Sequence, residues 1–434
     1  MLVSFKVGNY RSIGDEQIIS LIPAKGQTEY RENVYTIGKY AALNALVLYG
    51  ANSSGKSNIL KAIELLDRLV YLSARSNSTT ALPYDPNLLI DGFVGKPTTF
   101  EVTFVIDKWR YRYGVSFDTN SVQNEWLYRK ATGREVELFY REDDVIQVSS
   151  GFDRRSRIID AAIEATRENA LFLSTCDIFN IAEAKRIFGW FDQLISIDGL
   201  DTTREEINTI SLFENNEKYR FRINEYLKQL DLGLEGVELV KKEFNPPEVP
   251  EGIESSIRAR LIQELTGKMG TQVNAIHKTY DKSGGLKKST KAWALEERES
   301  AGTKKAFQLS GPIIYTLING GVLVIDEIEA KLHTKITKEI IALFLSSDTN
   351  PNKAQLLVAT HDTNLLKYSK LRRDQINFVE KNAREETEVY SLSDFRYFKG
   401  NKERPDADKE KRYLEGRYGA VPKVQVDKKL LEVL

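Results

Sequence analysis

The segment 50–57 carries the strongest chemical signal in the chain, because it reads Gly-Ala-Asn-Ser-Ser-Gly-Lys-Ser. This order matches the G-x-x-x-x-G-K-S pattern, in which the glycines let backbone N–H groups turn inward around a β-phosphate. Lys56 is expected to reach the β- and γ-phosphate oxygens, and Ser57 to hold Mg²⁺. An ordinary Gly-Ser turn is the alternative, and the strand and helix predicted around the segment disfavour it. The residues expected to bind ATP here are Gly50, Asn52, Ser53, Ser54, Gly55, Lys56, Ser57 and Asn58.

A phosphate loop of this kind requires an acidic partner at the end of an apolar strand, and the sequence GVLVIDE at 321–327 supplies it. Asp326 is expected in the Mg²⁺ shell, and Glu327 is expected to orient and polarise the attacking water as general base. The alternative is a buried strand that merely ends in surface acids.

A third apolar strand ending in a polar residue follows about 30 residues later, as QLLVATHD at 355–362. His361 at its end is placed to contact a γ-phosphate, although a solitary histidine at a strand end is more often structural. The catalytic residues expected from the three motifs are Lys56, Glu327 and His361.

Hydrophobic periodicity predicts the elements that position these motifs. The apolar run 45–49 predicts a strand before the loop, and apolar residues at helical spacing over 58–69 predict a helix after it. Around the second and third motifs we expect a helix over 302–317, a strand over 322–325, a helix over 336–345, and strands over 355–359 and 375–379.

The remaining segments have different patterns. Residues 2–7 and 17–22 predict a hairpin, and alternation from about 98 to 148 predicts a run of antiparallel strands. From 158 to about 230 the period lengthens and predicts several helices, including one pattern through 181–197. Three prolines in 244–253 indicate a linker, a strand pair is expected around 283–285, and 399–412 is predicted to be a charged loop.

Composition excludes several classes of protein. The 434 residues contain 62 Lys and Arg against 62 Asp and Glu, so the formal net charge is zero and no global positive excess indicates a nucleic-acid coat. The single cysteine, Cys176, cannot form an internal disulfide or a thiolate metal cluster. No apolar run reaches about 18 residues and the N-terminus lacks a signal-peptide pattern, so we expect a cytoplasmic protein without a membrane partner.

The order of the motifs resembles a known family. The segments NYRS (9–12), GANSSGKS, ESAGTKK (299–305), LVIDEIEAKLH (323–333), VATHDTNLL (358–366) and YLEGRYGAVP (413–422) are similar to those of split ABC-type ATPases related to SMC, RecF and the OLD-family defence proteins. The strongest resemblance is to ATPases of bacterial abortive-infection and phage-defence operons. About 270 residues separate Ser57 from Asp326, which indicates that the nucleotide core is split around an insertion.

The resemblance implies further site residues. Ser300 and Gly302 correspond to the signature element that completes the ATP site of a second subunit, whereas from the residues alone Ser300 is simply a helix N-cap. Arg11 and Ser12 correspond to N-terminal residues that touch nucleotide, against the alternative of an ordinary turn. His333 lies near a position that supports the dimer contact. For the glutamine of the Q-loop there is no clear match, and Gln123 and Glu125 are candidates.

The fold class implied is α/β: a split ABC-type head, with a mixed sheet and an antiparallel β subdomain, interrupted by a mainly helical insertion. The expected domains are an N-terminal ATPase lobe over 1–150, the insertion over 151–295, a C-terminal lobe over 296–398, and a charged loop and tail over 399–434. No heptad pattern is long enough for SMC-type arms. Asp406 and Asp408 lie in a charged setting without a strand, so no nuclease of the chain's own is expected.

Three alternative functions follow from these motifs and from the resemblance. The first is an ATP-driven switch that pairs head to tail with a second copy and controls a separately encoded effector, such as a TOPRIM-type nuclease, in anti-phage defence. The second is a RecF-like repair ATPase in which basic residues of the insertion grip DNA. The third, a stand-alone enzyme with an active site in the insertion, lacks a Ser/His/Asp order, an H-E-x-x-H motif or a Cys/His cluster.

Overall fold

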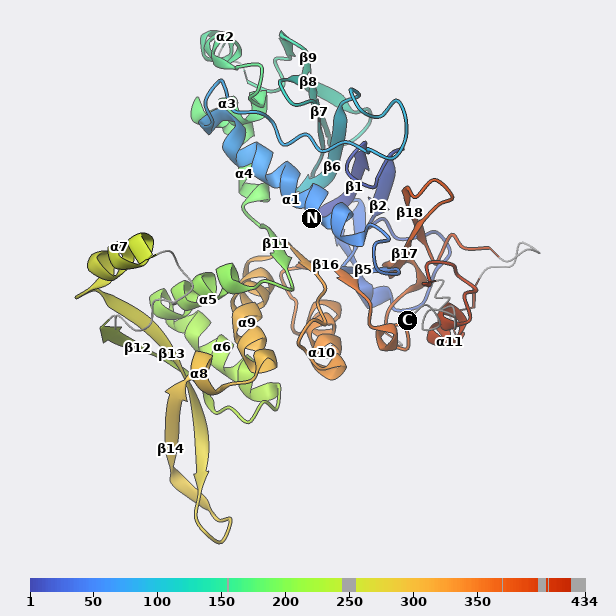
Figure 1. Cartoon of the computed structure of the whole chain (residues 1–434). Coiled ribbons are helices and arrows are strands. Elements are labelled where there is room, and N and C mark those ends of the chain that lie inside the picture. The colour runs from blue at the N-terminus through green and yellow to red at the C-terminus, as the bar shows by residue number, and fades with distance from the viewer. Residues whose placement is uncertain (154–155, 244–254, 369, 397–402, 405, 423–434) are drawn as a thin grey trace, which may run out of the picture. The chain divides into compact units, whose positions relative to one another are not determined.

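The computed structural model describes residues 1–153, 156–243, 255–368, 370–396, 403–404 and 406–422 (Figure 1). The predicted linker 244–253 and residues 399–402 and 405 of the predicted charged loop lie outside these residues. The chain divides into two compact units. Unit 1 comprises Met1–Leu200, Thr316–Ala330 and Thr334–Leu434, and unit 2 comprises Asp201–Tyr315 and Lys331–His333. The second unit thus begins 50 residues later than the insertion expected at 151, and residues 151–200 belong to the unit that carries the phosphate loop.

Unit 1 contains a seven-stranded antiparallel sheet in the order β10-β9-β8-β7-β6-β1-β2. The predicted N-terminal hairpin is confirmed, since Phe5 pairs with Ile19, and β1 also pairs with β6. The alternation between 98 and 148 forms five consecutive strands. The strands are β1 Leu2–Gly8, β2 Gln17–Ser20, β6 Thr98–Ile106, β7 Trp109–Phe117, β8 Val122–Lys130, β9 Val136–Glu142 and β10 Val145–Val148.

The second sheet of unit 1 has six strands in the order β11-β15-β16-β5-β17-β18, of which all but β18 run parallel. Near-continuous apolar runs are typical of parallel strands buried on both faces, and β5 is buried throughout. The strands are β5 Ala45–Tyr49, β11 Leu194–Asp198, β15 Val322–Asp326, β16 Gln355–Thr360, β17 Ile376–Lys381 and β18 Thr387–Ser391.

Strand β11 corrects the prediction of a helical pattern through 181–197. Only the first part is helical, as α4 Ala182–Phe191, and the run Leu-Ile-Ser-Ile then pairs in parallel with β15. Periodicity cannot distinguish so short an apolar run from the end of a helix. The consequence is that this edge strand, from a distant part of the chain, borders the strand that ends in Asp326.

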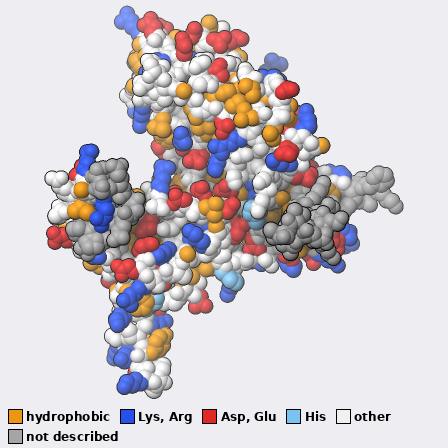
Figure 2. Space-filling view, in the orientation of Figure 1, with side chains coloured by type: hydrophobic (Ala, Val, Ile, Leu, Met, Phe, Trp, Pro, Cys, Tyr) orange, Lys and Arg blue, Asp and Glu red, His pale blue; other side chains and the backbone are white. Residues whose placement is uncertain are grey.

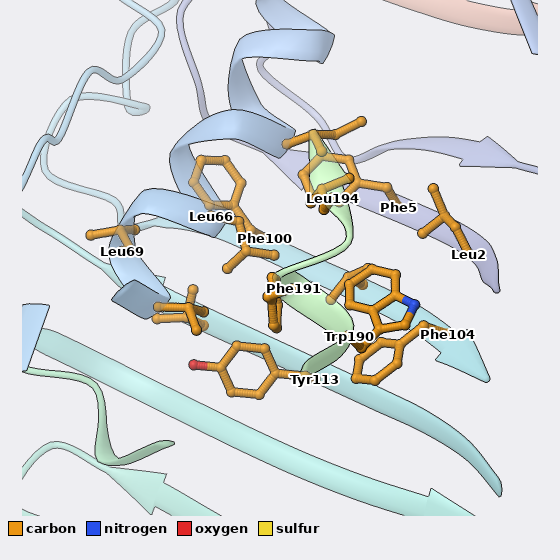
Figure 3. Close-up of a cluster of buried hydrophobic side chains, with 14 of the residues drawn as sticks. Leu2, Phe5, Leu66, Leu69, Phe100, Phe104, Tyr113, Trp190, Phe191 and Leu194 are labelled. Atoms are coloured by element: carbon orange, nitrogen blue, oxygen red, sulfur yellow. The ribbon is translucent and has the colours of Figure 1, made fainter. Parts of the chain in front are cut away.

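Helix α1, Lys56–Leu72, buries one face in the main core of unit 1. Figure 3 shows Leu66 and Leu69 of this helix in a cluster with Phe100 of β6 and Phe191 of α4. Trp190 stacks on Phe104 with ring centroids 4.2 Å apart. Burying a leucine side chain contributes about 1.5–3 kcal/mol, so Leu66 and Leu69 anchor the far end of the helix that follows the phosphate loop.

Unit 1 also contains a short hairpin and several helices. The predicted order of helix and strand around the second and third motifs is confirmed, and the ends of each element differ from the prediction by at most two residues. These elements are the hairpin β3 Val34–Ile37 and β4 Tyr40–Leu43, the helices α2 Ser156–Ala165, α3 Phe172–Ile178, α10 Thr334–Leu345 and α11 Lys409–Leu414, and the last turn of α9 Ala301–Asn319.

Unit 2 contains helices and also a three-stranded antiparallel sheet in the order β12-β13-β14. The strand pair expected around Ser283 is confirmed as β13 and β14, whereas β12 was not predicted. The elements are α5 Thr203–Asn215, α6 Glu217–Gln229, β12 Gly236–Glu243, α7 Ser255–Leu265, β13 Met269–Tyr280, β14 Leu286–Ala294, α8 Leu295–Arg298 and most of α9. Among the described helices of both units, none is long and apolar enough to cross a bilayer.

Candidate active site

The carboxyl ends of three neighbouring strands meet at one edge of the six-stranded sheet. The order β15-β16-β5 brings together Asp326 after the first strand, His361 after the second and Gly50 after the third. Ligands of open α/β sheets bind at this edge, where loops replace the strands. Unit 1 therefore gathers the three motifs, which lie up to about 310 residues apart in the sequence.

The phosphate loop needs its glycines for steric reasons. A Cβ atom on Gly50 would overlap the carbonyl oxygen of Val379, and one on Gly55 would overlap the Thr387 hydroxyl. Gly55 also has a φ of 104°, which side chains rarely allow. Ser53 adopts a left-handed φ of 62° without being glycine. The loop is thus held in a compact turn by its neighbours.

The start of α1 presents free backbone donors to this turn. Within the described residues no acceptor takes the N–H groups of Lys56, Ser57 or Asn58, as expected for the first turn of a helix. The buried Ser54 hydroxyl also lacks a partner there. Free N–H groups at a helix N-terminus, together with the helix dipole, favour a phosphate group. These donors fit the polyphosphate that the motif predicts.

Lys56 is folded back onto the loop. Its ammonium donates to the carbonyl oxygens of Gly50 and Ala51, at 2.9 and 3.1 Å, and its side chain is only 4% exposed. Burial lowers the pKa of Lys56 to about 8, although the nearby carboxylates of Asp326 and Glu329 act in the opposite direction. The loop therefore holds a buried cation whose charge is sensitive to what lies beside it.

Asp326 and Glu327 form a tight acidic turn at the end of β15. The Asp326 carboxylate accepts the backbone N–H of Glu327 at 3.1 Å, and Glu327 has a left-handed φ of 46°. The turn is supported by the residue after β11, since the N–H of Gly199 donates to the Asp326 carbonyl oxygen at 2.9 Å. A Cβ on Gly199 would overlap the carbonyl oxygens of both acidic residues. Because β11 was not predicted, sequence reasoning missed this support.

His361 lies at the same edge, and its Nδ1 atom is 3.5 Å from Lys56 Nζ. Its backbone N–H donates to the carboxylate of Glu329. The other oxygen of that carboxylate is buried and has no hydrogen-bond partner among the described residues. Glu329 is a site residue that the sequence reasoning missed, although its place two residues after Glu327 was a signal that a second acid faces the loop.

The N-terminal residues divide between two roles. Ser12 accepts a hydrogen bond from Asn58 at 2.7 Å and contacts the Thr387 hydroxyl at 2.7 Å, while Thr387 donates to the Ser54 carbonyl oxygen at 2.9 Å. Ser12 thus supports the phosphate loop through its neighbours. Arg11 instead binds Asp85 at 2.8 Å and borders a hollow of about 490 Å³ beside α1.

Residues near the C-terminus also hold the loop, in the segment that resembled the family motif. The Ala51 N–H donates to the Ala420 carbonyl oxygen at 3.0 Å, and the Tyr413 hydroxyl donates to the same oxygen at 2.9 Å. The Ala420 N–H in turn donates to Glu380 at 2.7 Å. Residues 413–420 therefore fix the second residue of the phosphate loop, a contact that no local pattern predicts.

The residues matched to the signature element belong to unit 2. Ser300 accepts the N–H of Thr303 at 3.1 Å, so it caps helix α9 as the residue pattern alone predicted. The backbone of Gly302 lies close to that of Lys331. A Cβ on Gly302 would be 2.7 Å from the Lys331 carbonyl oxygen. His333 lies in the short segment that also belongs to unit 2.

The two Q-loop candidates have other partners. Glu125 is fully buried in β8, where it accepts the Tyr113 hydroxyl at 2.9 Å and the N–H groups of Phe172 and Leu173. Burial raises the pKa of Glu125, while those donors oppose the rise. Gln123 donates to Asp118 at 2.9 Å. Glu125 thus anchors the start of α3.

The donors at the sheet edge suit Mg²⁺ better than a protein-only metal centre. Among the described residues no group of three or more His, Cys, Asp and Glu is placed to hold a metal ion. Mg²⁺ in phosphate sites is held by one or two protein oxygens, with phosphate and water supplying the rest. Ser57 and Asp326, the residues predicted to hold Mg²⁺, offer oxygen atoms of this kind.

Comparison with known proteins places the site in a family context. Residues 45–367 match the family model described as "AAA domain, putative AbiEii toxin, Type IV TA system", which spans all three motifs. The match confirms the family expected from the motifs. No curated protein matches the chain.

Several solved structures are similar at low identity. The SMC head domain from Thermotoga maritima is 12% identical, with 90% of this chain and 98% of that chain covered and a TM-score of 0.39. An Smc head domain from Pyrococcus furiosus, bound to the C-terminal domain of ScpA, is 14% identical, with 90% and 96% covered and a TM-score of 0.40. The recombination mediator protein RecF with ATP is 15% identical, with 84% and 94% covered and a TM-score of 0.35.

Proposed function

The chain belongs to the AAA-domain family whose model spans residues 45–367, and from this membership we propose that it binds ATP with Mg²⁺ and hydrolyses it at the edge of the six-stranded sheet. One observation carries the proposal: Lys56 lies beside His361 and is electrostatically coupled to Asp326, Glu327 and Glu329. A purely structural lysine would not need three carboxylates and a free helix N-terminus around it.

Each residue has a defined task in this proposal. The N–H groups at the start of α1 bind the phosphates, and Lys56 exchanges the carbonyl oxygens of Gly50 and Ala51 for phosphate oxygens. Ser57 and Asp326 would hold Mg²⁺, which when bound would neutralise charge on the phosphate oxygens. Glu327 positions the attacking water and accepts its proton. His361 stabilises charge on the terminal phosphate oxygens, and Glu329 fixes the backbone of His361.

The wider proposal concerns assembly and purpose. Ser300 caps α9, and the N-terminus of this helix is suited to an anion. We infer that Ser300 and Gly302 of one copy complete the ATP site of another in a head-to-tail dimer. We further propose a cytoplasmic switch that controls a separately encoded effector, such as a nuclease, in anti-phage defence. The family description names a toxin–antitoxin system, which is in keeping with a two-component arrangement.

Two variants test the ATPase proposal. Lys56→Ala should weaken ATP binding strongly, because it removes the buried cation that meets the phosphates. Glu327→Gln should keep ATP affinity and lower turnover by at least about 100-fold, because general-base catalysis contributes about 10²–10⁴ in rate. ATP affinity by calorimetry and phosphate release by a coupled assay give the two readouts. Retained turnover in Glu327→Gln would show that another residue acts as the base.

A further inference from the structure

Strands β13 and β14 form an arm that extends beyond the sheet of unit 2 (Figure 1). Strand β12 pairs with β13 only as far as Ile276, so from His277 onward β13 pairs with β14 alone. At the tip the Asp281 carboxylate accepts the N–H groups of Ser283 and Gly285, both at 2.8 Å. The arm is therefore a closed, two-stranded ribbon, and every residue from 281 to 292 is exposed.

The arm concentrates positive charge in a chain whose net charge is zero. Residues 268–294 contain six lysines and one acidic residue, Asp281, whose carboxylate is engaged in the turn. Lys278 pairs with Glu235 at 2.9 Å. Four further lysines lie in the turn and in β14, and they form no ion pair with any residue that the structure describes. They are Lys282, Lys287, Lys288 and Lys291. Figure 2 shows basic side chains along this arm.

The strand register places the lysines on both faces of the ribbon. Lys278 lies opposite Thr290 and His277 opposite Lys291, and adjacent residues of a strand point to opposite faces. Lys278 and Lys291 therefore point to opposite faces, while Lys287 and Lys288 lie nearer the tip, where the register of the two strands shifts. Lys282 adds charge at the tip. A flat anionic surface would meet only one of these faces, whereas a groove with anionic walls meets both.

The base of the arm is firmly mounted. The ring of His277 stacks on Trp293 at 4.0 Å between centroids, and both rings bind the Glu299 carboxylate, at 2.8 and 2.7 Å. Glu299 directly precedes Ser300, the cap of α9. The arm is thus fixed to the start of the helix that carries the proposed signature residues.

We propose that this arm binds duplex DNA by entering a groove and contacting the phosphate backbone. The major groove of B-form DNA admits a two-stranded ribbon and is lined by phosphates on both sides. The lysines and the neighbouring Thr290 hydroxyl supply backbone contacts, while the Thr279 hydroxyl bonds to Ser289 within the ribbon. The arm contains no arginine, and its lysines and hydroxyl groups are suited to contacts with phosphate oxygens. This activity goes beyond the ATPase and does not depend on it.

The test is DNA binding by the full chain without nucleotide, measured by fluorescence anisotropy with a labelled 30-base-pair duplex at several salt concentrations. The arm variant replaces Lys282, Lys287, Lys288 and Lys291 by Gln. If each lysine neutralises one phosphate, the slope of log affinity against log salt falls by about 3.6 in this variant. Between 50 and 200 mM salt, wild-type affinity should then drop about 150-fold more than that of the variant.

The matched control replaces four exposed lysines of unit 1 by Gln, namely Lys25, Lys39, Lys108 and Lys185. It has the same net charge as the arm variant and should keep the wild-type slope. Thermal unfolding checks that both variants fold. The proposal fails if wild type does not bind the duplex at 50 mM salt, or if both variants lose affinity equally. It also fails if the arm variant keeps DNA binding and loses binding to phosphatidylserine vesicles.

Discussion

Lys56 shows how a single residue ties the fold to the proposed chemistry. Its ammonium is almost completely buried, and burial lowers its pKa to about 8. Because an unfolded lysine has a pKa near 10.4, the unfolded chain binds more protons than the folded chain between these values. The free energy of unfolding therefore rises from about pH 8 to pH 10, relative to a Lys56→Met variant. Below pH 8 Lys56 is charged in the folded protein, and its burial then lowers the free energy of unfolding by the full amount.

The same pKa predicts how ATP binding depends on pH. Phosphate oxygens favour the protonated lysine, so binding takes up a proton once the pH exceeds about 8. ATP affinity should then fall by up to about tenfold per pH unit between pH 8 and 10. Calorimetry in buffers of different ionisation enthalpy measures both the affinity and the proton uptake.

Two variants separate this effect from general changes at high pH. Lys39→Met, which alters an exposed lysine, should keep the wild-type profile. Glu329→Gln removes one carboxylate that favours the charged form of Lys56. The ATP affinity of this variant should therefore begin to fall at a lower pH than that of wild type. A Glu329→Gln profile identical to wild type would contradict the proposed coupling between Glu329 and Lys56.

At the scale of elements, the edge strand β11 supports the acidic turn through Gly199. Replacing this glycine by alanine places a Cβ against the carbonyl oxygens of Asp326 and Glu327. Overpacking of this kind costs about 1–3 kcal/mol, and here it also displaces the proposed general base. Gly199→Ala should therefore lower both the melting temperature and the turnover number, measured by calorimetry and phosphate release.

Gly189 provides a control within the neighbouring helix. It lies in α4, it is exposed, and a Cβ there would meet no atom within 4 Å. Gly189→Ala should stabilise the protein by up to about 1 kcal/mol, because alanine is the better helix former. Wild-type turnover in Gly199→Ala, with only stability reduced, would show that β11 does not position Glu327.

At the scale of the whole molecule, residues from almost the full length of the chain converge on the phosphate loop. Ser12, Gly199, Thr387 and Ala420 each support it or the adjacent acidic turn. By contrast, Ser300 and the DNA-binding arm belong to unit 2. In the proposed dimer, each ATP site combines the phosphate loop from unit 1 of one copy with Ser300 from unit 2 of the other copy.

Mixing two inactive variants tests this assignment. Lys56→Ala removes the phosphate contact in its own copy, and Ser300→Arg obstructs the site that it completes in the partner. A mixed dimer has one site with both residues intact, so an equimolar mixture should recover up to about a quarter of wild-type turnover. Ser300→Arg alone should keep ATP affinity as a monomer. No recovery on mixing, or loss of ATP affinity in isolated Ser300→Arg, would contradict the trans role.

The sequence by itself determined the parts of the site that depend on local order. The phosphate loop, the acidic strand end and the histidine strand end are each encoded within about eight residues, since a tight turn or a buried strand constrains its residue types directly. The N-terminal hairpin, the antiparallel strands and the N-cap at Ser300 follow from the same local rules.

Only the tertiary structure decided which distant segments support these parts. Strand β11 could not be distinguished from a helix end, because its pairing with β15 and not its own pattern fixes its conformation. The hydrogen bonds from the Ala51 N–H to Ala420 and from the Thr387 hydroxyl to Ser54 both end on backbone carbonyl oxygens, which every residue type carries. The boundary of unit 2 at Asp201 likewise depends on packing between strands that lie far apart in the sequence.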